Sequence, residues 1–252
     1  MWVVATYRAT SLFSLKPAAA TASGGRTLLV PTPYAVKMAL LDVACRLVGQ
    51  PAAAEAWDAW LGTCPVALRV PEAVVVNNVF IRYLRKKEFK SGNKKERIKQ
   101  AKIEKQYPFY NTIAYREYAQ LAGDLGVALQ VETDAQAQQI TRWFAHINYL
   151  GKRGSFMQLQ HVPTTPDDLS EDWLVVGQPL EDGFALDRLL TQLDDVGEDA
   201  TFEVVNIYNP NRYSTKVKLG KHRLLHHVAL PYERVASSRG YTHYRRQPEA
   251  DA

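Results

Sequence analysis

The chain has 252 residues, of which 46% are hydrophobic and 23% charged, an ordinary globular composition that excludes wholesale disorder. No run approaches the ~20 consecutive apolar residues of a membrane-spanning helix. Cys45 and Cys64 are too few for a disulfide framework or a zinc quartet, so we expect a reducing, cytoplasmic location and no metal.

The formal net charge of +5 conceals an uneven distribution. Residues 82–105 hold 11 basic and 3 acidic groups, whereas residues 106–204 hold 5 basic and 16 acidic groups. Residues 205–252 are basic again, with 9 basic and 3 acidic groups. Such segregation indicates a local anionic partner, and a nucleic-acid backbone is the first candidate. The acidic block, residues 106–204, has two possible roles. It either restricts where a nucleic acid can lie and docks basic faces of neighbouring subunits, or it is ordinary solubilising surface.

The first third of the chain predicts a strand, a loop and two helices. Residues 2–7 have the apolar content of a buried strand, and Arg8 and Lys16 interrupt the stretch too early for a secretory signal. After a loop of small residues at 11–26, Thr32-Pro33 begins a helix that ends at Gly49. Residues 52–61 predict a second, short helix.

The next elements predict a ferredoxin-like unit. Strand patterns occupy residues 73–83, 109–118, 127–131 and 156–162. Asp134 is the predicted cap of a helix whose C-terminal glycine is Gly151. Its predicted inner stripe is Ile140, Trp143, Phe144 and Ile147. The order strand–helix–insertion–strand–strand–helix–strand predicts an α+β, ferredoxin-like domain over residues 1–162, with an insertion at about 82–108.

Residues 163–252 predict a β-rich C-terminal region after a proline-rich, acidic linker at 163–171. Strands are expected at 173–176, 202–208, 215–219 and 224–230, and a helix at 184–193. The polar residues from about 235 onward predict a loose, flexible tail.

The basic segment 82–105 is the strongest functional signal. Asn93 and Glu96 resemble a capping box, and the helix that follows has only Ile98 and Ala101 as an inner stripe. A helix so polar buries too little surface to be stable alone. With 11 basic groups against 3 acidic ones, pairing within the helix cannot neutralise it, which favours a nucleic-acid-contacting protrusion over a solvated charged face. The candidate RNA-binding residues are Arg82, Arg85, Lys86, Lys87, Lys90, Lys94, Lys95, Arg97, Lys99 and Lys102, and the bordering aromatic residues Tyr83, Phe89, Tyr107, Phe109 and Tyr110 can stack on unpaired bases.

A second signal is the sequence Gly151-Lys152-Arg153-Gly154 at the predicted helix-to-strand turn. Its glycines allow a close backbone approach to a ligand, and Lys152 and Arg153 can bind phosphate. The alternative is an ordinary helix C-cap with solubilising charges.

Three stretches together resemble the Cas-five family, within the repeat-associated (RAMP) superfamily of CRISPR–Cas systems. They are the N-terminal strand with Pro31-Thr32-Pro33-Tyr34 leading into residues 35–48, the basic insertion arising near residues 79–85, and the stretch from Ile147 to Gly154. The resemblance covers about residues 1–162 and consists of these short motifs.

The resemblance implies a non-catalytic subunit of a type I Cascade surveillance complex. Members of the family have an RRM-like palm and a projecting thumb, and they hold the 5′ handle of the guide RNA (crRNA) and support recognition of target DNA. The implied partners are the crRNA, the backbone and large subunits and, through the complex, target DNA; no cofactor is implied. By position, residues 82–105 would form the thumb, Gly151 to Gly154 a handle-contacting loop, and Lys37 and Arg46 further phosphate contacts. The lysine-rich, helical thumb departs from a plain hairpin, which leaves open whether it contacts guide RNA, target DNA or a neighbouring subunit.

Two alternatives remain. A relative of the family cuts precursor crRNA without metal, and His146, Tyr149, Lys152 and His161 supply suitable groups here, although His146 is expected in the core and His161 in solvent. The second alternative is a general RNA- or DNA-binding protein with a basic arm. His222, His226 and His227 lack a carboxylate or cysteine neighbour for a metal, and with Lys216, Lys218, Lys221 and Arg223 they predict a second phosphate-facing surface instead.

Overall fold

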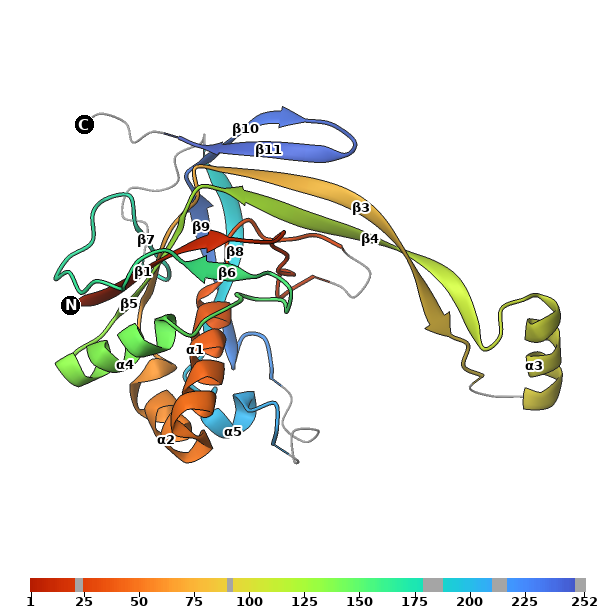
Figure 1. The fold of residues 1–252 in the computed structure, drawn as a ribbon, viewed down its shortest axis with the longest axis horizontal. Helices are drawn as coiled ribbons and strands as arrows, with labels where there is room; N and C mark the ends of the chain where they lie inside the picture. The colour runs from red at the N-terminus through yellow and green to blue at the C-terminus, as the bar shows by residue number, and fades with distance from the viewer. Residues whose placement is uncertain (21–24, 90–92, 179–187, 210–216, 248–252) are drawn as a thin grey trace.

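The protein is described here by a computed structural model that places residues 1–20, 25–89, 93–178, 188–209 and 217–247. It is an α+β fold built on antiparallel sheets, as the sequence predicted (Figure 1). Among these residues, none of the helices combines the length and apolar character needed to span a bilayer.

The central sheet has the strand order β6-β1-β5-β2-β7. Its strands are β1 (Trp2–Ala9), β2 (Val66–Arg69), β5 (Leu125–Gln130), β6 (Met157–Leu159) and β7 (Leu174–Val175). Strand β1 pairs antiparallel with both β5 and β6, and β2 pairs antiparallel with β5. Two split β-α-β units therefore interlock, which confirms the predicted ferredoxin-like order.

The second strand of this unit is β2, which the sequence prediction missed. Val66, Ala67 and Leu68 are all buried, so the strand lacks the alternation that marks a half-exposed strand. The predicted strand at 73–83 belongs instead to β3 (Ala73–Lys86), which forms part of a separate sheet.

Two helices cover one face of the central sheet. Helix α1 (Pro33–Val48) begins as predicted, with the Thr32 hydroxyl accepting from the Ala35 amide at 3.2 Å. Helix α4 (Asp134–Phe144) buries the predicted stripe, and the Tyr7 hydroxyl donates to the Phe144 carbonyl at 2.7 Å. Helix α2 (Gln50–Ala56) continues into a π-helical turn, η1 (Trp57–Leu61), in place of one regular helix over 52–61.

Both predicted ends of α4 require correction. The cap is Thr133 rather than Asp134, because Thr133 and Gln136 form a reciprocal capping box. The helix ends at Phe144. The amide of His146 donates to the carbonyl of Trp143, three residues back, and this tighter turn ends the α-helical hydrogen-bond pattern. Gly151 therefore lies in the following turn and does not cap the helix.

A second sheet carries a long arm. It has the order β10-β11-β3-β4, with β4 at Phe109–Ala122, β10 at Tyr232–Ser237 and β11 at Tyr241–Arg246. Strands β3 and β4 pair in register along all 14 residues of each. Figure 1 shows these two strands leaving the body side by side and ending near helix α3 (Lys94–Ile103). We call residues 79–116 the arm.

The C-terminal region departs from the prediction in several places. The expected loose tail is wrong as far as Arg246, because β11 completes the second sheet by pairing with β3. The expected helix at 184–193 falls partly outside the described residues, and from Leu189 onward the chain is strand β8 (Leu189–Val196), paired with β9 (Arg223–Leu230). The expected strand at 202–208 is instead a short helix, α5 (Phe202–Val205), and the Phe202 amide donates to the Asp58 carboxylate at 2.7 Å.

Three other expected strands differ in extent. The strand expected at 156–162 is confined to β6, whose register with β1 covers only residues 157–159. The strand expected at 173–176 shortens to β7. Of the strand expected at 215–219, residues 215 and 216 lie outside the described residues, and Leu219 makes one isolated bridge to Arg223 across a turn. The domain division at residue 163 stays a prediction, although β7 and β11 both complete sheets begun in the first part of the chain.

Lys37 does not lie on the solvent side of α1, so the basis for a phosphate contact there is wrong. Helix α1 packs against β8, and only 1% of the Lys37 side chain is exposed. Its ammonium donates to Asp195 Oδ1 at 2.7 Å and to the Gly62 carbonyl at 3.1 Å. Lys37 therefore joins α1, the η1 turn and β8.

We expect Lys37→Met to lower the free energy of unfolding by about 3 kcal/mol, because it leaves the Asp195 carboxylate without its buried partner. The control is Arg46→Met, which breaks an exposed ion pair to Asp42 within the same helix and should cost less than about 0.5 kcal/mol. Urea unfolding followed by circular dichroism measures both values. Equal losses in the two variants would contradict the role assigned to Lys37.

Candidate nucleic-acid interface

The segment after β1 turns back along the outer edge of β4. Phe13 and Ala119 exchange two backbone hydrogen bonds of 2.8 Å, and the Glu117 amide donates to the Gly25 carbonyl at 2.7 Å. A side chain at Gly25 would overlap the Tyr115 carbonyl, so this close approach requires glycine. The contact places Lys16 and Arg26 beside the base of the arm.

The same segment holds the turn from Gly151 to Gly154 in place. The Ser11 hydroxyl donates to the Gly154 carbonyl at 2.6 Å and accepts from the Phe156 amide at 2.7 Å. The buried Ser155 hydroxyl accepts from the Ser14 amide at 3.0 Å. Gly151 has φ +77°, a conformation that favours glycine. The turn is thus a fixed part of the fold, and Lys152 and Arg153 project from it into solvent.

Five basic side chains from separate parts of the sequence line one pocket of about 540 Å³. They come from the loop after β1, from β4, from the glycine turn and from β9. None of the described residues that line this pocket is acidic. The five are Lys16, Arg26, Arg116, Lys152 and Arg223, and we call this site the basic pocket.

Four of these five cations have no carboxylate partner among the described residues; Arg223 is the exception. The Arg223 Nε donates to the buried Asp194 carboxylate at 2.9 Å, and its guanidinium lies 4.2 Å from the centroid of the Tyr34 ring. The Lys152 ammonium lies 5.8 Å from the centroid of the Tyr118 ring. An anion in the pocket would relieve the mutual repulsion of these cations, and a phosphate group has the matching chemistry.

The arm presents its basic residues to solvent. Arg82, Arg85, Lys86, Lys94, Lys95, Arg97, Lys99 and Lys102 are exposed, whereas Lys87 is partly buried and donates to the Gln106 side chain at 2.8 Å. Lys90 lies outside the described residues. Within residues 82–89 and 93–105, none of these cations forms an ion pair.

Helix α3 begins after Asn93, but the Asn93 side chain makes no cap hydrogen bond, so the predicted capping box is wrong. Of its two predicted inner residues, Ala101 is buried and Ile98 is partly buried. The Lys102 ammonium lies 5.7 Å from the centroid of the Tyr107 ring. The helix therefore rests on few apolar contacts, as its composition predicted.

The four residues considered for RNA cleavage do not line one site. Tyr149 lines a more apolar cavity of about 370 Å³, which shares Leu15, Gly151 and Arg223 with the basic pocket. His146 is exposed rather than in the core, since α4 ends before it, and its Nδ1 lies 2.9 Å from the Arg142 carbonyl oxygen. His161 is exposed, as expected. Neither histidine lines the pocket that holds Lys152.

The other predicted residues lie elsewhere. Arg46 is half-exposed on α1, paired with Asp42 at 3.0 Å and donating to the His146 carbonyl at 3.4 Å. His222 is buried and accepts from the Lys218 amide at 3.0 Å, whereas the His227 Nε2 lies 3.0 Å from the Gln192 amide nitrogen. No group of three or more His, Cys, Asp or Glu side chains in the described parts of the chain is arranged to hold a metal ion.

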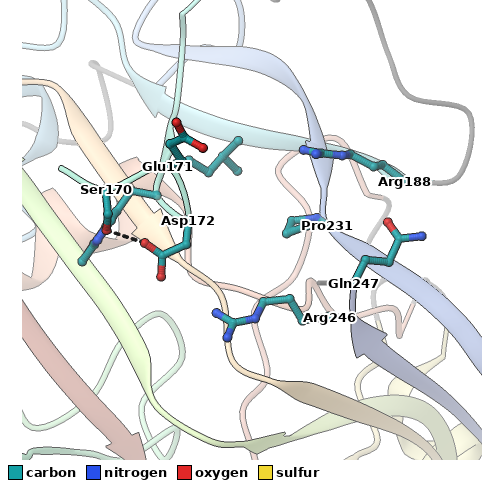
Figure 2. A pocket seen from close by; sticks show the side chains of 9 residues that line it. Ser170, Glu171, Asp172, Arg188, Pro231, Arg246 and Gln247 are labelled. Atoms are coloured by element: carbon teal, nitrogen blue, oxygen red, sulfur yellow. Dashed lines mark hydrogen bonds between the residues drawn. The ribbon is translucent and has the colours of Figure 1, made fainter. Parts of the chain in front are cut away.

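A third cavity, of about 460 Å³, has a different electrostatic character from the basic pocket. Figure 2 shows Arg188 and Arg246 in this cavity together with the carboxylates of Glu171 and Asp172. The Ser170 hydroxyl donates to Asp172 at 2.6 Å. Because acidic and basic groups share this cavity, it suits a polyanion less well than the basic pocket does.

Sequence reasoning missed most of the basic pocket. It identified Lys152 from the glycine turn and Arg223 from the basic C-terminal block, but not Lys16, Arg26 or Arg116. Each of these three is an isolated basic residue in its own segment, and no sequence spacing marks it. They converge only because the loop after β1 lies along β4.

No protein-family model matches the chain, and a search of curated proteins finds no significant match. Among solved structures, the chain is similar to a CRISPR protein from Archaeoglobus fulgidus, with a TM-score of 0.43 and 12% identity, covering 98% of this chain and 92% of the other. It is also similar to a structure described as a Cas protein, with a TM-score of 0.33 and 17% identity, covering 77% and 80% of the two chains.

We expect the double variant Arg116→Gln/Lys152→Gln to bind a short single-stranded RNA at least tenfold more weakly than the unaltered chain. A hydrogen bond to a charged group is worth about 1.5 kcal/mol, and about 1.4 kcal/mol is a factor of ten in affinity. Fluorescence anisotropy with an RNA of about five nucleotides measures the effect. The control is Arg142→Gln, an exposed arginine on α4 without an ion pair among the described residues. Equal weakening in variant and control would show that the pocket is not the binding site.

Proposed function

We propose that this protein is a guide-RNA-binding subunit of a type I CRISPR surveillance complex, holding the 5′ handle of the crRNA. The basic pocket carries this proposal. Its cations surround a space for phosphate, and it incorporates Gly151 and Lys152 of the turn that resembles the glycine-rich loop of the Cas-five family. The ferredoxin-like palm beside it agrees with the same resemblance.

The arm supports the proposal independently. Its exposed cations have no acidic partners within the described residues, so they repel one another. Binding a polyanion would offset this repulsion. In the proposed complex the arm corresponds to the thumb, next to the guide RNA and the adjacent backbone subunit.

We further propose that the protein does not cleave RNA. General acid–base cleavage requires its groups within hydrogen-bond reach of one 2′-hydroxyl and the adjacent phosphate. Lys152 lines the basic pocket and Tyr149 the neighbouring cavity, but His146 and His161 line neither. The alternative of a metal-independent endoribonuclease is therefore the weaker one.

The identity of the bound RNA tests the function directly. Affinity purification of the full chain from its native cells, followed by RNA sequencing, should recover one discrete class of guide RNAs with a common 5′ handle. Mixed cellular RNA would contradict the proposal and favour the general RNA- or DNA-binding alternative.

A triple variant separates binding from cleavage. We expect His146→Ala/Lys152→Ala/His161→Ala to leave the 5′ ends of mature crRNAs unchanged, because no catalytic group is lost. Northern blotting and primer extension of crRNA in cells measure this outcome. Accumulation of uncut precursor would contradict the non-catalytic role.

The salt dependence of binding tests the arm. We expect Lys94→Gln/Lys95→Gln/Lys99→Gln/Lys102→Gln to reduce the slope of log affinity against log salt concentration by up to ~2.8, at ~0.7 for each lost contact with single-stranded RNA. Replacing the same four lysines by arginine keeps the charge and should keep the slope. An unchanged slope in the glutamine variant would show that the arm contacts protein instead.

A further inference from the structure

The register of the second sheet defines which side chains share each of its two faces. Residues directly opposite each other in an antiparallel pair point to the same face. Asn77 of β3 pairs with Tyr118 of β4 and Tyr241 of β11. Two residues toward the tip, Val79 pairs with Arg116, and beyond it Tyr83 pairs with Thr112 and Arg85 pairs with Tyr110. These rows share one face.

The opposite face changes character along the sheet, from buried valines at the body to a mixture of aromatic, aliphatic and basic side chains, including Arg82 and Lys86, along the arm. Near the body it carries Val74 and Val76, which are buried in the core. Along the arm it continues as Phe80, Leu84 and Ile113, which are 67%, 65% and 62% exposed. The rings of Phe80 and Tyr115 on this face pack edge to face against each other, with centroids 5.2 Å apart.

The first face combines tyrosine rings with cations. Tyr83 and Tyr241 are exposed, whereas Tyr110 and Tyr118 are partly exposed. Two cations lie over these rings: the Lys152 ammonium is 5.8 Å from the Tyr118 centroid, and the Lys87 ammonium is 5.2 Å from the Tyr110 centroid. We call this the tyrosine face, defined by Tyr83, Tyr110, Tyr118 and Tyr241 with Arg85 and Arg116.

The tyrosine face is continuous with the basic pocket. Arg116 belongs to both, and Lys152 lines the pocket while lying over Tyr118. From Tyr118 to Tyr110 the chain advances eight residues along one strand, or about 27 Å at ~3.4 Å per residue. A single strand leaving the pocket therefore has a track of rings and cations that leads toward the tip of the arm.

We propose that the tyrosine face is a stacking surface for unpaired nucleotides of the RNA held in the basic pocket. This inference rests on the proposed function, since it extends the binding site of the same RNA. Base–aromatic stacking is worth ~1–3 kcal/mol per base and is tolerant of sequence, because every base has a π-face. The pocket anchors the strand through phosphate, and the tyrosine face holds the bases that follow.

The test compares RNA oligonucleotides of about 5 and about 15 nucleotides, the first long enough for the pocket and the second long enough to continue along the arm. The variant is Tyr83→Leu/Tyr110→Leu in the full chain, since neither tyrosine contacts a residue that lines the basic pocket. It should bind the short RNA like the unaltered chain, and bind the long RNA at least about fivefold more weakly for each stacked base lost. Tyr83→Phe/Tyr110→Phe retains the rings and should restore binding of the long RNA.

The matched control is Tyr115→Leu, the same substitution on β4 but on the opposite face. It should leave binding of both RNAs unchanged, and circular dichroism should show that all variants keep the fold. Loss of long-RNA binding in Tyr115→Leu equal to that in the tyrosine-face variant, or no loss in either, overturns the inference.

The outcomes also separate this inference from the proposed function. Pocket-dependent binding of the short RNA without any effect of the tyrosine variant overturns the stacking surface and leaves the function standing. Failure of the unaltered chain to bind either RNA overturns both.

Discussion

The uninterrupted register of β3 with β4 is the constraint on which the rest of the structure depends. Its first part lies in the body, where Val74 and Val76 are buried against the core. Its second part is the arm, whose side chains are largely exposed. Because the register does not slip between the two, the side-chain alternation set in the core continues along the arm. The packing of the body thus decides which side chains share each face far from it.

Strand β4 also organises the candidate interface. The outer edge of β4 pairs with Phe13 and Gly25, and this pairing carries Lys16 and Arg26 to the base of the arm. The serine contacts from Ser11 and Ser14 then secure the glycine turn against the same segment. Five cations from distant segments meet as a consequence of backbone pairing, and none of them has to be close to another in sequence.

The charge segregation acquires a structural account. Five of the six ion pairs in the described residues use a carboxylate from the acidic block 106–204: Asp124, Asp172, Asp194, Asp195 and Asp199. Their partners are Arg8, Arg69, Arg223, Lys37 and Lys221, and none of these belongs to the arm. Part of the acidic block therefore forms ion pairs within the body, and these pairs leave the positive charge of the arm unneutralised.

The sequence by itself determined the α+β class, the ferredoxin-like order, the helix at 33–48 and the basic insertion, because these depend on local patterns: periodicity, a proline after a capping threonine, and a run of lysines. Sequence patterns did not predict the features that depend on contacts between distant segments. The buried strand β2 lacks alternation, and the polar residues 241–246 form a strand because β3 offers them an edge. Lys37 is buried because Asp195 of β8, which packs against α1, pairs with it. Only the tertiary structure decided the basic pocket and the two faces of the arm, since both arise from backbone pairing between segments that no sequence spacing connects.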